Sequence, residues 1–564
     1  MSQDPPAIKP KYYPPILPGH REWPVVRLAK NRKDFVSTVV QSAVASILEH
    51  TQDHQALIEE LELTLFLERN RLRQNPWKVD PEDEEEFWGK IKGQLVHLSQ
   101  ENSEEARQNA QQMLEQIVSR YAEEIAGNFK QSRYRFARTL IIFGFARLLN
   151  AARLKGIKSL WSRELDLPDK IQINGEIDQL RALAKLGTVV MVPTHFSNLD
   201  SALIGWVIQH LGLPAFIYGA GLNLFNIGIF AYFMNSLGAY KVDRRKKNMV
   251  YLETLKTYST EALKYGCHSL FFPGGTRSRS GMIEKKLKMG LLSTVMEAQR
   301  CNFENHPQGE AAKIFVVPVV LNYHFVLEAP GLINQFLEMQ GQERYYVEND
   351  EFSNSYKIIK FLFKFFTKGS DISVSIGRGM DVMGNYVNDQ GISFDQDGNK
   401  IDTSDYFKSL GRIQKDDQRD GEYTRMLSER IVSEFHRNNR VFSSHLVAFA
   451  AFQILKNRYN KLDLFNFLRI QPDELVIDYA HFLEVCATLR NKIFEMNQQG
   501  ALHTAEHLKG KIEEVVEHGL YNVGLYHAKR PALRNKQGLI VSQDLNLLYF
   551  YHNRLQGYGL EQYI

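Results

Sequence analysis

The sequence predicts an α/β protein, with a mainly parallel sheet covered by helices and with helical N-terminal and C-terminal domains. Short apolar runs of β type alternate with helical patterns between Ile171 and about Gly384. The runs are continuous rather than alternating, which is typical of parallel strands buried on both faces. On either side of this region, apolar residues recur mostly at helical spacing. The runs of β type are Thr188–Val192, Ala215–Tyr218, Ser269–Phe272, Ile314–Leu321 and Ile372–Ile376.

Length and composition indicate a globular protein of several domains. The chain has 564 residues, and 44% of them are hydrophobic, which is enough for large cores. The net charge of +4 is small for this length, so nucleic acid is not expected as a partner. Three widely separated cysteines match neither a disulfide framework nor a zinc-binding spacing. We therefore expect no metal and a reducing, cytoplasmic location.

The first 165 residues divide into a lead and a helical domain. Residues 1–24 contain seven of the 18 prolines, which predicts an extended lead. Residues 25–165 are predicted to form a helical domain. Within it, Asp80-Pro81-Glu82 indicates a helix start with an N-capping aspartate, followed by a solvated acidic turn. We expect no signal peptide and no transmembrane helix, because the sequence lacks the apolar stretches that either requires.

Two segments combine apolar and basic residues. Between Phe129 and Arg163 there is no acidic residue, and arginines and lysines flank Leu140–Phe145. This basic amphipathic pattern suits an interfacial helix on an anionic membrane surface, and equally a helix packed on the protein with a basic edge. Tyr356–Lys368 leaves a similar choice between a buried helix and one that faces a membrane or an acyl chain. Any membrane contact is expected to be peripheral.

Residues 166–385 are predicted to form the α/β domain, and residues 386–564 a mostly helical C-terminal domain. Residues 385–405 are rich in asparagine, aspartate and glycine, which predicts turns. Pro318 lies near the start of an apolar run. Because proline cannot donate to a sheet, it predicts an edge strand or a bulge.

His195 and Asp200 are the candidate catalytic pair. The run before His195 is predicted to be a strand that ends in a turn, with a helix beginning soon afterwards. This order puts the imidazole at the C-terminal end of a strand, where open α/β sheets bind ligands. Asp200 follows over one helical turn later and is expected to orient the ring. A histidine held by a carboxylate is a general base that deprotonates a hydroxyl near neutral pH.

Two loops downstream carry arginines suited to phosphate. Gly238–Arg245 is a short β run that ends in consecutive arginines, of which Arg244 is the candidate because a guanidinium binds phosphate through two parallel hydrogen bonds. Phe271–Gly281 runs into a glycine-rich turn whose backbone can approach an anion closely. Its candidate binding residues are Gly275, Thr276, Arg277, Ser278 and Arg279. Further basic candidates are Lys241, Arg245, Lys286 and Lys288.

These segments together resemble the four ordered blocks of the glycerolipid acyltransferase superfamily. The blocks are His-x-x-x-x-Asp, Gly-x-x-x-x-x-Arg, Phe-x-Glu-Gly-x-Arg-Ser and Val-Pro. They match His195 with Asp200, Gly238 with Arg244, Phe272–Ser278, and Val317-Pro318. Further segments resemble the larger glycerol-3-phosphate and dihydroxyacetone-phosphate acyltransferases, namely Lys288–Leu292, Asn322–Glu328, Ser443–Ala450 and Leu547–Arg554. Gly274 departs from the pattern, since the family usually has glutamate there.

The resemblance implies acyl transfer from a thioester, acyl-CoA or an acyl carrier protein, to glycerol 3-phosphate in phospholipid synthesis at the cytoplasmic face of a membrane. His195 would take the hydroxyl proton, and Arg244, Arg277 and Arg279 would hold the phosphate. Amides of the Gly274-Gly275 turn or of the helix after His195 would stabilise the oxyanion. No metal, cofactor or covalent enzyme intermediate is expected. Dihydroxyacetone phosphate and 1-acyl-glycerol 3-phosphate remain alternative acceptors, and an inactive lipid-binding scaffold is an alternative that Gly274 motivates.

Overall fold

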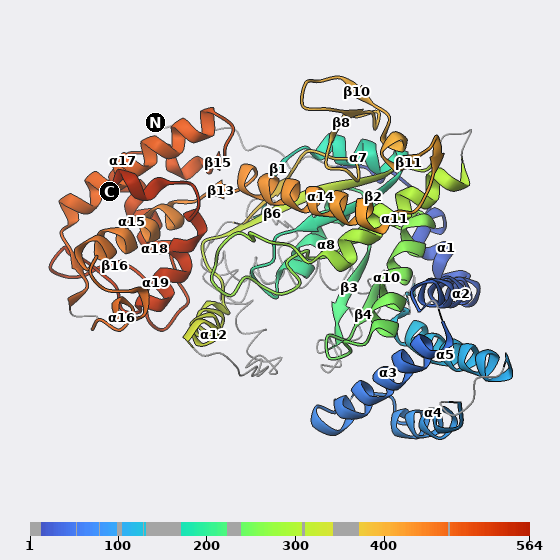
Figure 1. Ribbon diagram of the computed structural model, residues 1–564. Coiled ribbons are helices and arrows are strands. Elements are labelled where there is room, and N and C mark those ends of the chain that lie inside the picture. Colours follow the sequence, from blue (N-terminus) through green and yellow to red (C-terminus); the bar gives the residue numbers. More distant parts are fainter. Residues whose placement is uncertain are drawn as a thin grey trace, which may run out of the picture.

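The computed structural model confirms the predicted fold class (Figure 1). A central sheet lies between the N-terminal helices, drawn in blue, and the C-terminal helices, drawn in orange and red. The described residues are 13–51, 53–77, 79–98, 104–127, 129–130, 171–222, 238–306, 311–341, 372–471 and 474–564. The segments predicted between Phe129 and Arg163 and over Tyr356–Lys368 lie almost wholly outside these residues.

The central sheet has seven strands in the order β1-β7-β6-β2-β5-β3-β4. Their bounds are β1 Ile171–Gly175, β2 Thr188–Pro193, β3 Ile217–Gly221, β4 Ala239–Val242, β5 Ser269–Leu270, β6 Ile314–Tyr323 and β7 Ile372–Ile376. Only the β6–β7 pair is antiparallel among these strands. The C-terminal ends of β2, β5, β3 and β4 therefore share one edge of the sheet, where the predicted site residues follow.

Both faces of the sheet are buried, as the continuous apolar runs predict. On β2, Val189 and Met191 join a core that includes α7 (Ile177–Leu186) and α8 (Asp200–His210). Val190 and Val192 point the other way, into a core shared with α11 (Met289–Asn305). The alternation follows from the two-residue period of a strand.

Pro318 marks a bulge within a central strand, and not a sheet edge. It lies in β6, between β7 and β2. Val319 pairs with Ile376 and Val316 with Met380, so the partner chain has one extra residue opposite Pro318. The Pro318 carbonyl accepts from Gly377 N at 2.8 Å. Because the bulge changes the pairing at this point, the missing proline N–H leaves the ladder intact.

The N-terminal helices form the predicted helical region and pack on α10 (Met249–Lys264). They are α1 Pro24–Lys30, α2 Arg32–His50, α3 His54–Gln74, α4 Glu84–Leu98 and α5 Glu104–Ile125, after a short η1 His20–Glu22. The predicted helix start at Asp80 is wrong, since α4 begins at Glu84. Asp80 instead pairs with Arg71 and Arg245, and Glu84 is buried against Arg71 at 2.6 Å. Ion pairs with distant arginines override the local capping pattern here.

The C-terminal region is helical and has two parts. Leu427, Ile431 and Phe435 of α14 (Asp417–Arg437) belong to the core on the sheet. The helices beyond it gather around α15 (Ser443–Arg458), which is buried from Ser443 to Leu455. These are α16 Leu464–Phe467, α17 Tyr479–Gln498, α18 Ile512–Asn522 and α19 Leu545–His552, with η6 Glu506–Leu508, η7 Asn553–Leu555 and η8 Leu560–Tyr563. Leu547 and Leu548 of α19 join the same core as β2.

Short strands and turns fill the connections. The turns predicted over residues 385–405 are confirmed, and they separate β8, β9 and β10. The remaining elements are α12 Ala329–Gly341, η4 Thr403–Phe407, β8 Tyr386–Val387, β9 Ser393–Phe394, β10 Lys400–Ile401, β11 Lys408–Ser409, β12 Arg412–Ile413, β13 Arg440–Val441, β14 Val476–Ile477, β15 His503–Thr504, β16 Leu533–Arg534 and β17 Ile540–Val541. Across the described residues, none of the helices combines the length and apolarity needed to span a bilayer.

Candidate functional site

The predicted pairing of His195 with Asp200 is present. His195 lies in the turn after β2, and Asp200 opens α8. His195 Nδ1 is 2.8 Å from Asp200 Oδ2. Because the carboxylate accepts, Nδ1 carries the proton, and Nε2 keeps its lone pair. The imidazole stacks on Phe272 with 4.1 Å between ring centroids, and 14% of its side chain is exposed.

Asp200 is fully buried, and four donors hold its carboxylate. Besides the His195 ring, Oδ2 accepts from Phe196 N at 2.7 Å and Ser197 N at 2.9 Å. Oδ1 accepts from the Tyr323 hydroxyl at 2.5 Å. Burial, together with the negative charge of Asp200, raises the pKa of Tyr323 well above its usual value. Tyr323 therefore stays a donor and fixes the carboxylate that orients His195.

The glycine-rich loop after β5 is bonded to the backbone of His195. Ser278 N donates to the His195 carbonyl at 2.7 Å, and Ser278 Oγ donates to the Met282 carbonyl at 2.7 Å. Gly275 has φ of +77°, a left-handed conformation that favours glycine. Its N–H donates to the Phe272 carbonyl at 3.0 Å. The structure thus brings this loop to His195, while Ser278 and the Gly275 amide are occupied within the protein.

Glu328 links Arg277 to the turn that carries His195. Its Nη1 is 3.4 Å from Glu328 Oε1, and 17% of its side chain is exposed. The same carboxylate accepts from Asn198 N at 2.8 Å and from Ser197 Oγ at 3.1 Å. Burial raises the pKa of Glu328, against the positive charge of Arg277. Thr276 and Arg279 are half-buried in the same loop.

Arg244 follows a different strand from His195. It is exposed after β4, which lies three places from β2 in the strand order. Its neighbour Arg245 is taken by Asp80 and Asp243, and its guanidinium lies 3.9 Å from the Trp77 ring centroid. Arg245 therefore has a structural role. The other basic candidates differ in how exposed their side chains are. Lys241 is half-buried, Lys286 and Lys288 are exposed, and the stem of Lys288 covers Gly275.

The amides of the turn before α8 are already bonded. Phe196 N and Ser197 N donate to Asp200, and Asn198 N donates to Glu328. These three amides precede the helix and are not free to stabilise an oxyanion, so the role of the helix after His195 stays a prediction. In the glycine-rich loop the Gly275 amide is bonded as well, which leaves the Gly274 end of the predicted turn as the candidate.

Arg554, from the C-terminal end of the chain, is a site residue that the sequence analysis missed. Its guanidinium lies 4.0 Å from the Phe196 ring centroid and donates to Asn322 Oδ1 and Asn439 Oδ1. Full burial lowers the pKa of Arg554 to about 10. Tyr323, Glu328 and Arg554 all lie in segments that resemble the family. The sequence therefore marked these segments but did not predict what the three residues do. Glu284, which accepts from His195 N at 3.2 Å, had no such signal.

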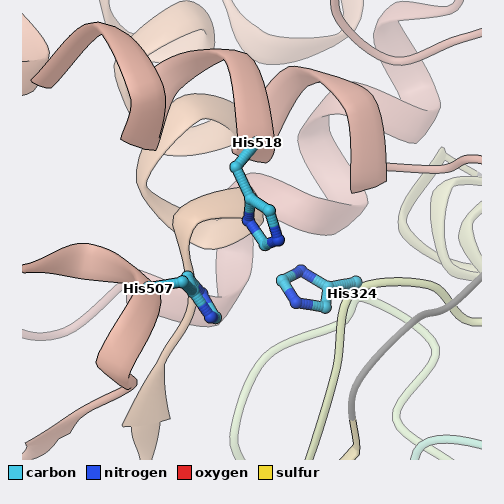
Figure 2. A group of neighbouring side chains, drawn as sticks. All are labelled: His324, His507 and His518. Atoms are coloured by element: carbon cyan, nitrogen blue, oxygen red, sulfur yellow. The ribbon is translucent and has the colours of Figure 1, made fainter. Parts of the chain in front are cut away.

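Three histidines gather where the loop after β6 meets the C-terminal helices (Figure 2). Ligand-type atoms of His324, His507 and His518 lie within 4.8 Å of one another. However, Ser443 N–H donates to His507 Nε2 at 3.0 Å, so His507 Nδ1 carries the proton of the neutral ring. His518 Nδ1 contacts Ser443 Oγ at 2.8 Å. Because a metal ligand needs a free lone pair, His507 does not fit as the third ligand of a metal while its Nε2 accepts from Ser443 N–H.

The class that this fold and site define is an acyltransferase domain. Residues 175–322 match the family described as Acyltransferase. The matched segment contains His195, Asp200, Arg244, the glycine-rich loop and the Val317-Pro318 block, in the order that the sequence predicts. The matched segment is therefore similar to the Acyltransferase family, in agreement with the resemblance that the sequence predicts.

Curated relatives bear the name glycerol-3-phosphate acyltransferase. The chain is 33% identical to the one from Actinobacillus succinogenes over 153 residues, covering 27% of this chain and 18% of the relative. It is 34% identical to the one from Pasteurella multocida over 155 residues, covering 27% and 18%. It is 24% identical to the one from Pseudoalteromonas atlantica over 246 residues, covering 43% and 26%. The chain thus spans about a fifth to a quarter of the length of these relatives.

We predict that His507 contributes to acid sensitivity of folding. Burial lowers the pKa of His507 to about 4, below the value of about 6.5 expected on unfolding. The unfolded chain therefore binds the extra proton between these values, so stability is present above pH 6.5 and falls as the pH drops towards 4. This histidine alone should cost about 2 kcal/mol at pH 5. Thermal midpoints at pH 7 and pH 5 measure the loss.

The matched variant is His507→Gln, whose amide oxygen can accept from Ser443 N–H but whose side chain cannot take up a proton. The difference between its midpoints at the two pH values should be smaller than in the wild type. An equal difference in both proteins would contradict the role of His507.

We predict that Arg554→Met lowers the free energy of unfolding by about 3 kcal/mol. Methionine has a similar volume but leaves the buried oxygens of Asn322, Asn439 and Leu321 without their donor. Arg534→Met is the control, because that arginine is 42% exposed and its pair with Glu517 is solvated. Thermal or denaturant unfolding measures both. A loss at position 554 no larger than in the control would contradict the prediction.

Proposed function

We propose that this chain is an O-acyltransferase that moves a fatty acyl group from a thioester donor to a hydroxyl of glycerol 3-phosphate. The observation that carries the proposal is the buried Asp200, whose carboxylate accepts a hydrogen bond from His195 Nδ1 and so leaves the Nε2 lone pair able to act as a base. The relatives' names support glycerol 3-phosphate as the acceptor, and phospholipid synthesis is the context that the family resemblance implies.

In the proposed reaction His195 acts as general base and then as general acid. Nε2 takes the proton from the acceptor hydroxyl while the hydroxyl oxygen attacks the thioester carbonyl carbon. Asp200 stabilises the imidazolium that forms, as the buried hydrogen-bonded aspartate of a Ser-His-Asp triad does. When the tetrahedral intermediate collapses, the carbon–sulfur bond breaks and the thiolate leaves with the proton from Nε2. The product is an ester of the acceptor, and no covalent bond to the enzyme forms.

The acceptor phosphate is proposed to bind at the glycine-rich loop. Arg277 is close to the His195 turn and is oriented by Glu328, so its guanidinium is held in one direction before a ligand arrives. Arg279 and Thr276 lie in the same loop. Arg244, exposed after β4, is proposed as a further contact to the phosphate. Fixing the phosphate orients the hydroxyl towards His195, which replaces a random encounter with an aligned one.

The donor, the compartment and the membrane contact complete the proposal. Acyl-CoA and acyl carrier protein are both chemically suitable donors, because each presents an activated thioester that needs no further cofactor. Contact with an anionic membrane at its cytoplasmic face is proposed from the basic residues between Phe129 and Arg163. Co-sedimentation with vesicles containing anionic lipid, compared with neutral vesicles, tests this contact.

We predict that His195→Ala lowers kcat by at least about 1,000-fold, because the acceptor hydroxyl loses its base. Asp200→Asn should lower kcat by about 100-fold to 10,000-fold, since the amide no longer holds the ring in the required tautomer. Transfer of a labelled acyl group to glycerol 3-phosphate measures both variants. Binding of the acyl donor should change little in His195→Ala.

Near-normal transfer by His195→Ala would overturn the assignment of the base. Wild-type protein that forms no product from glycerol 3-phosphate, dihydroxyacetone phosphate or 1-acyl-glycerol 3-phosphate would instead support a lipid-binding scaffold. Product formed only with one of the last two acceptors would correct the substrate.

We predict that Arg277→Ala raises KM for glycerol 3-phosphate by about 10-fold to 100-fold and changes KM for the acyl donor little. A charged hydrogen bond to phosphate of about 1.5–3 kcal/mol accounts for this range. Arg277→Lys should recover part of the loss, because lysine keeps the charge but not the planar fork. Arg425→Ala on the exposed face of α14 is the control. An unchanged KM for the acceptor in Arg277→Ala would remove Arg277 from the phosphate site.

A further inference from the structure

Gly274 stands where the acyltransferase family usually has a glutamate, and the space for a side chain there is already filled. A Cβ atom added to Gly274 would lie 3.0 Å from Glu284 Cγ and 3.1 Å from Glu284 Oε1. Gly274 does not have the left-handed backbone of Gly275, so its conformation accepts other residues. The glycine is therefore explained by the neighbouring carboxylate and not by strain in the turn.

Glu284 is joined directly to the residue that carries the proposed base. Its Oε1 accepts from His195 N at 3.2 Å. Its Oε2 is buried and has no hydrogen-bond partner among the described residues, although the residue as a whole is half-buried. Burial raises the pKa of Glu284 to about 7, and the negative charge of Asp200 adds to the effect. A buried carboxyl group that bonds the backbone of a base is typical of functional sites.

Glu284 completes a series of backbone contacts. The amides of His195, Phe196, Ser197 and Asn198 are consecutive, and each donates to a carboxylate. Asp200 accepts the middle two, Glu328 accepts the last, and Glu284 accepts the first. The direction of the imidazole depends on this backbone, because the ring is attached at the first of the four residues.

We propose that Glu284 supplies, from ten residues downstream, the carboxylate that the family usually carries at the position of Gly274, and that it positions His195 for acyl transfer. The inference rests on the proposed function, since positioning has kinetic consequences only if His195 reacts. Glu284 contacts the His195 backbone and not the reacting atoms, so it is a positioning residue. In this chain the carboxyl group of Glu284 occupies the space beside Gly274, and it comes from the other end of the loop.

Kinetics separate positioning from binding. Glu284→Ala should lower kcat for acyl transfer by about 10-fold to 100-fold, because a shift of about 1 Å in a catalytic group has effects of this size. KM for glycerol 3-phosphate should stay within about twofold. Glu284→Gln keeps an oxygen that can accept from His195 N, so its kcat should stay within about threefold of the wild type. Wild-type kcat in Glu284→Ala would overturn the proposal.

The exchange of positions tests whether the two sites are equivalent. Gly274→Glu combined with Glu284→Ala should recover kcat to within about 10-fold of the wild type. Gly274→Glu alone forces two carboxyl groups into one space and should lower both kcat and thermal stability. Failure of the double variant to exceed Glu284→Ala, with an unchanged thermal midpoint, would overturn the equivalence. If Glu284→Ala alone does not fold, kcat of the double variant is compared with kcat of Glu284→Gln. A difference within about 10-fold supports the equivalence of the two sites, and a larger loss overturns it.

Hydrogen exchange measured by mass spectrometry tests the contact without catalysis. In Glu284→Ala, the peptide that contains His195 should exchange faster, and in the double variant its protection should return. If exchange changes between the variants in this way but the wild-type protein transfers no acyl group, the proposed function is overturned and the positioning role of Glu284 is kept. Exchange at His195 that is the same in all variants would overturn the positioning role, whatever the activity.

Discussion

The geometry of the candidate site depends on the turn from His195 to Asn198, whose four consecutive amides donate to the carboxyl groups of three acidic side chains. Such a turn has no strand or helix partner for these amides, so side chains must provide the acceptors. Asp200 does so from within the turn, and its second oxygen is held by the Tyr323 hydroxyl. The same carboxylate also receives the His195 ring. Backbone conformation and imidazole tautomer are therefore set by one buried group, and loss of any of the three acids would free part of the turn.

The C-terminal helices are part of this site and not an appended domain. Asn553 donates to the Ser280 carbonyl at 2.8 Å, at the end of the glycine-rich loop. A Cβ at Gly281 would lie 2.2 Å from the Phe550 carbonyl, so α19 approaches this loop closely enough to require glycine there. Arg554 then reaches across to the Phe196 ring and to Asn322. The contacts of Asn553 and Phe550 support the end of the loop that carries Arg277, and Arg554 supports the residue that follows His195. The position of the loop thus depends on residues near the chain's other end.

The parts of the structure that the sequence predicted are those set by local patterns. Continuous apolar runs located most strands of the sheet, and the spacing of His195 and Asp200 predicted their contact correctly. The edge strand β1 gave a weaker apolar signal because its residues are only partly buried. Asp80 was interpreted as a helix cap, since local rules do not reveal its partner Arg245, 165 residues away. Glu284 lies 89 residues from His195 and is unremarkable in sequence, so only the fold could reveal its contact. The donor and the membrane contact stay predictions.

The segment that matches the Acyltransferase family ends at residue 322, yet several groups that fix the site lie beyond it. Tyr323 and Glu328 follow immediately, and Arg554 comes from the C-terminal helices. The matched segment thus holds the candidate catalytic histidine, its aspartate and the loop with Arg277, while residues outside the segment supply part of the support for their orientation. A protein that shares only the matched segment must satisfy the same buried amides and carboxylates with other residues. Similarity over the four blocks is therefore informative about the chemistry of the site. How the site is aligned with a particular acceptor depends on residues outside the blocks, which differ between proteins.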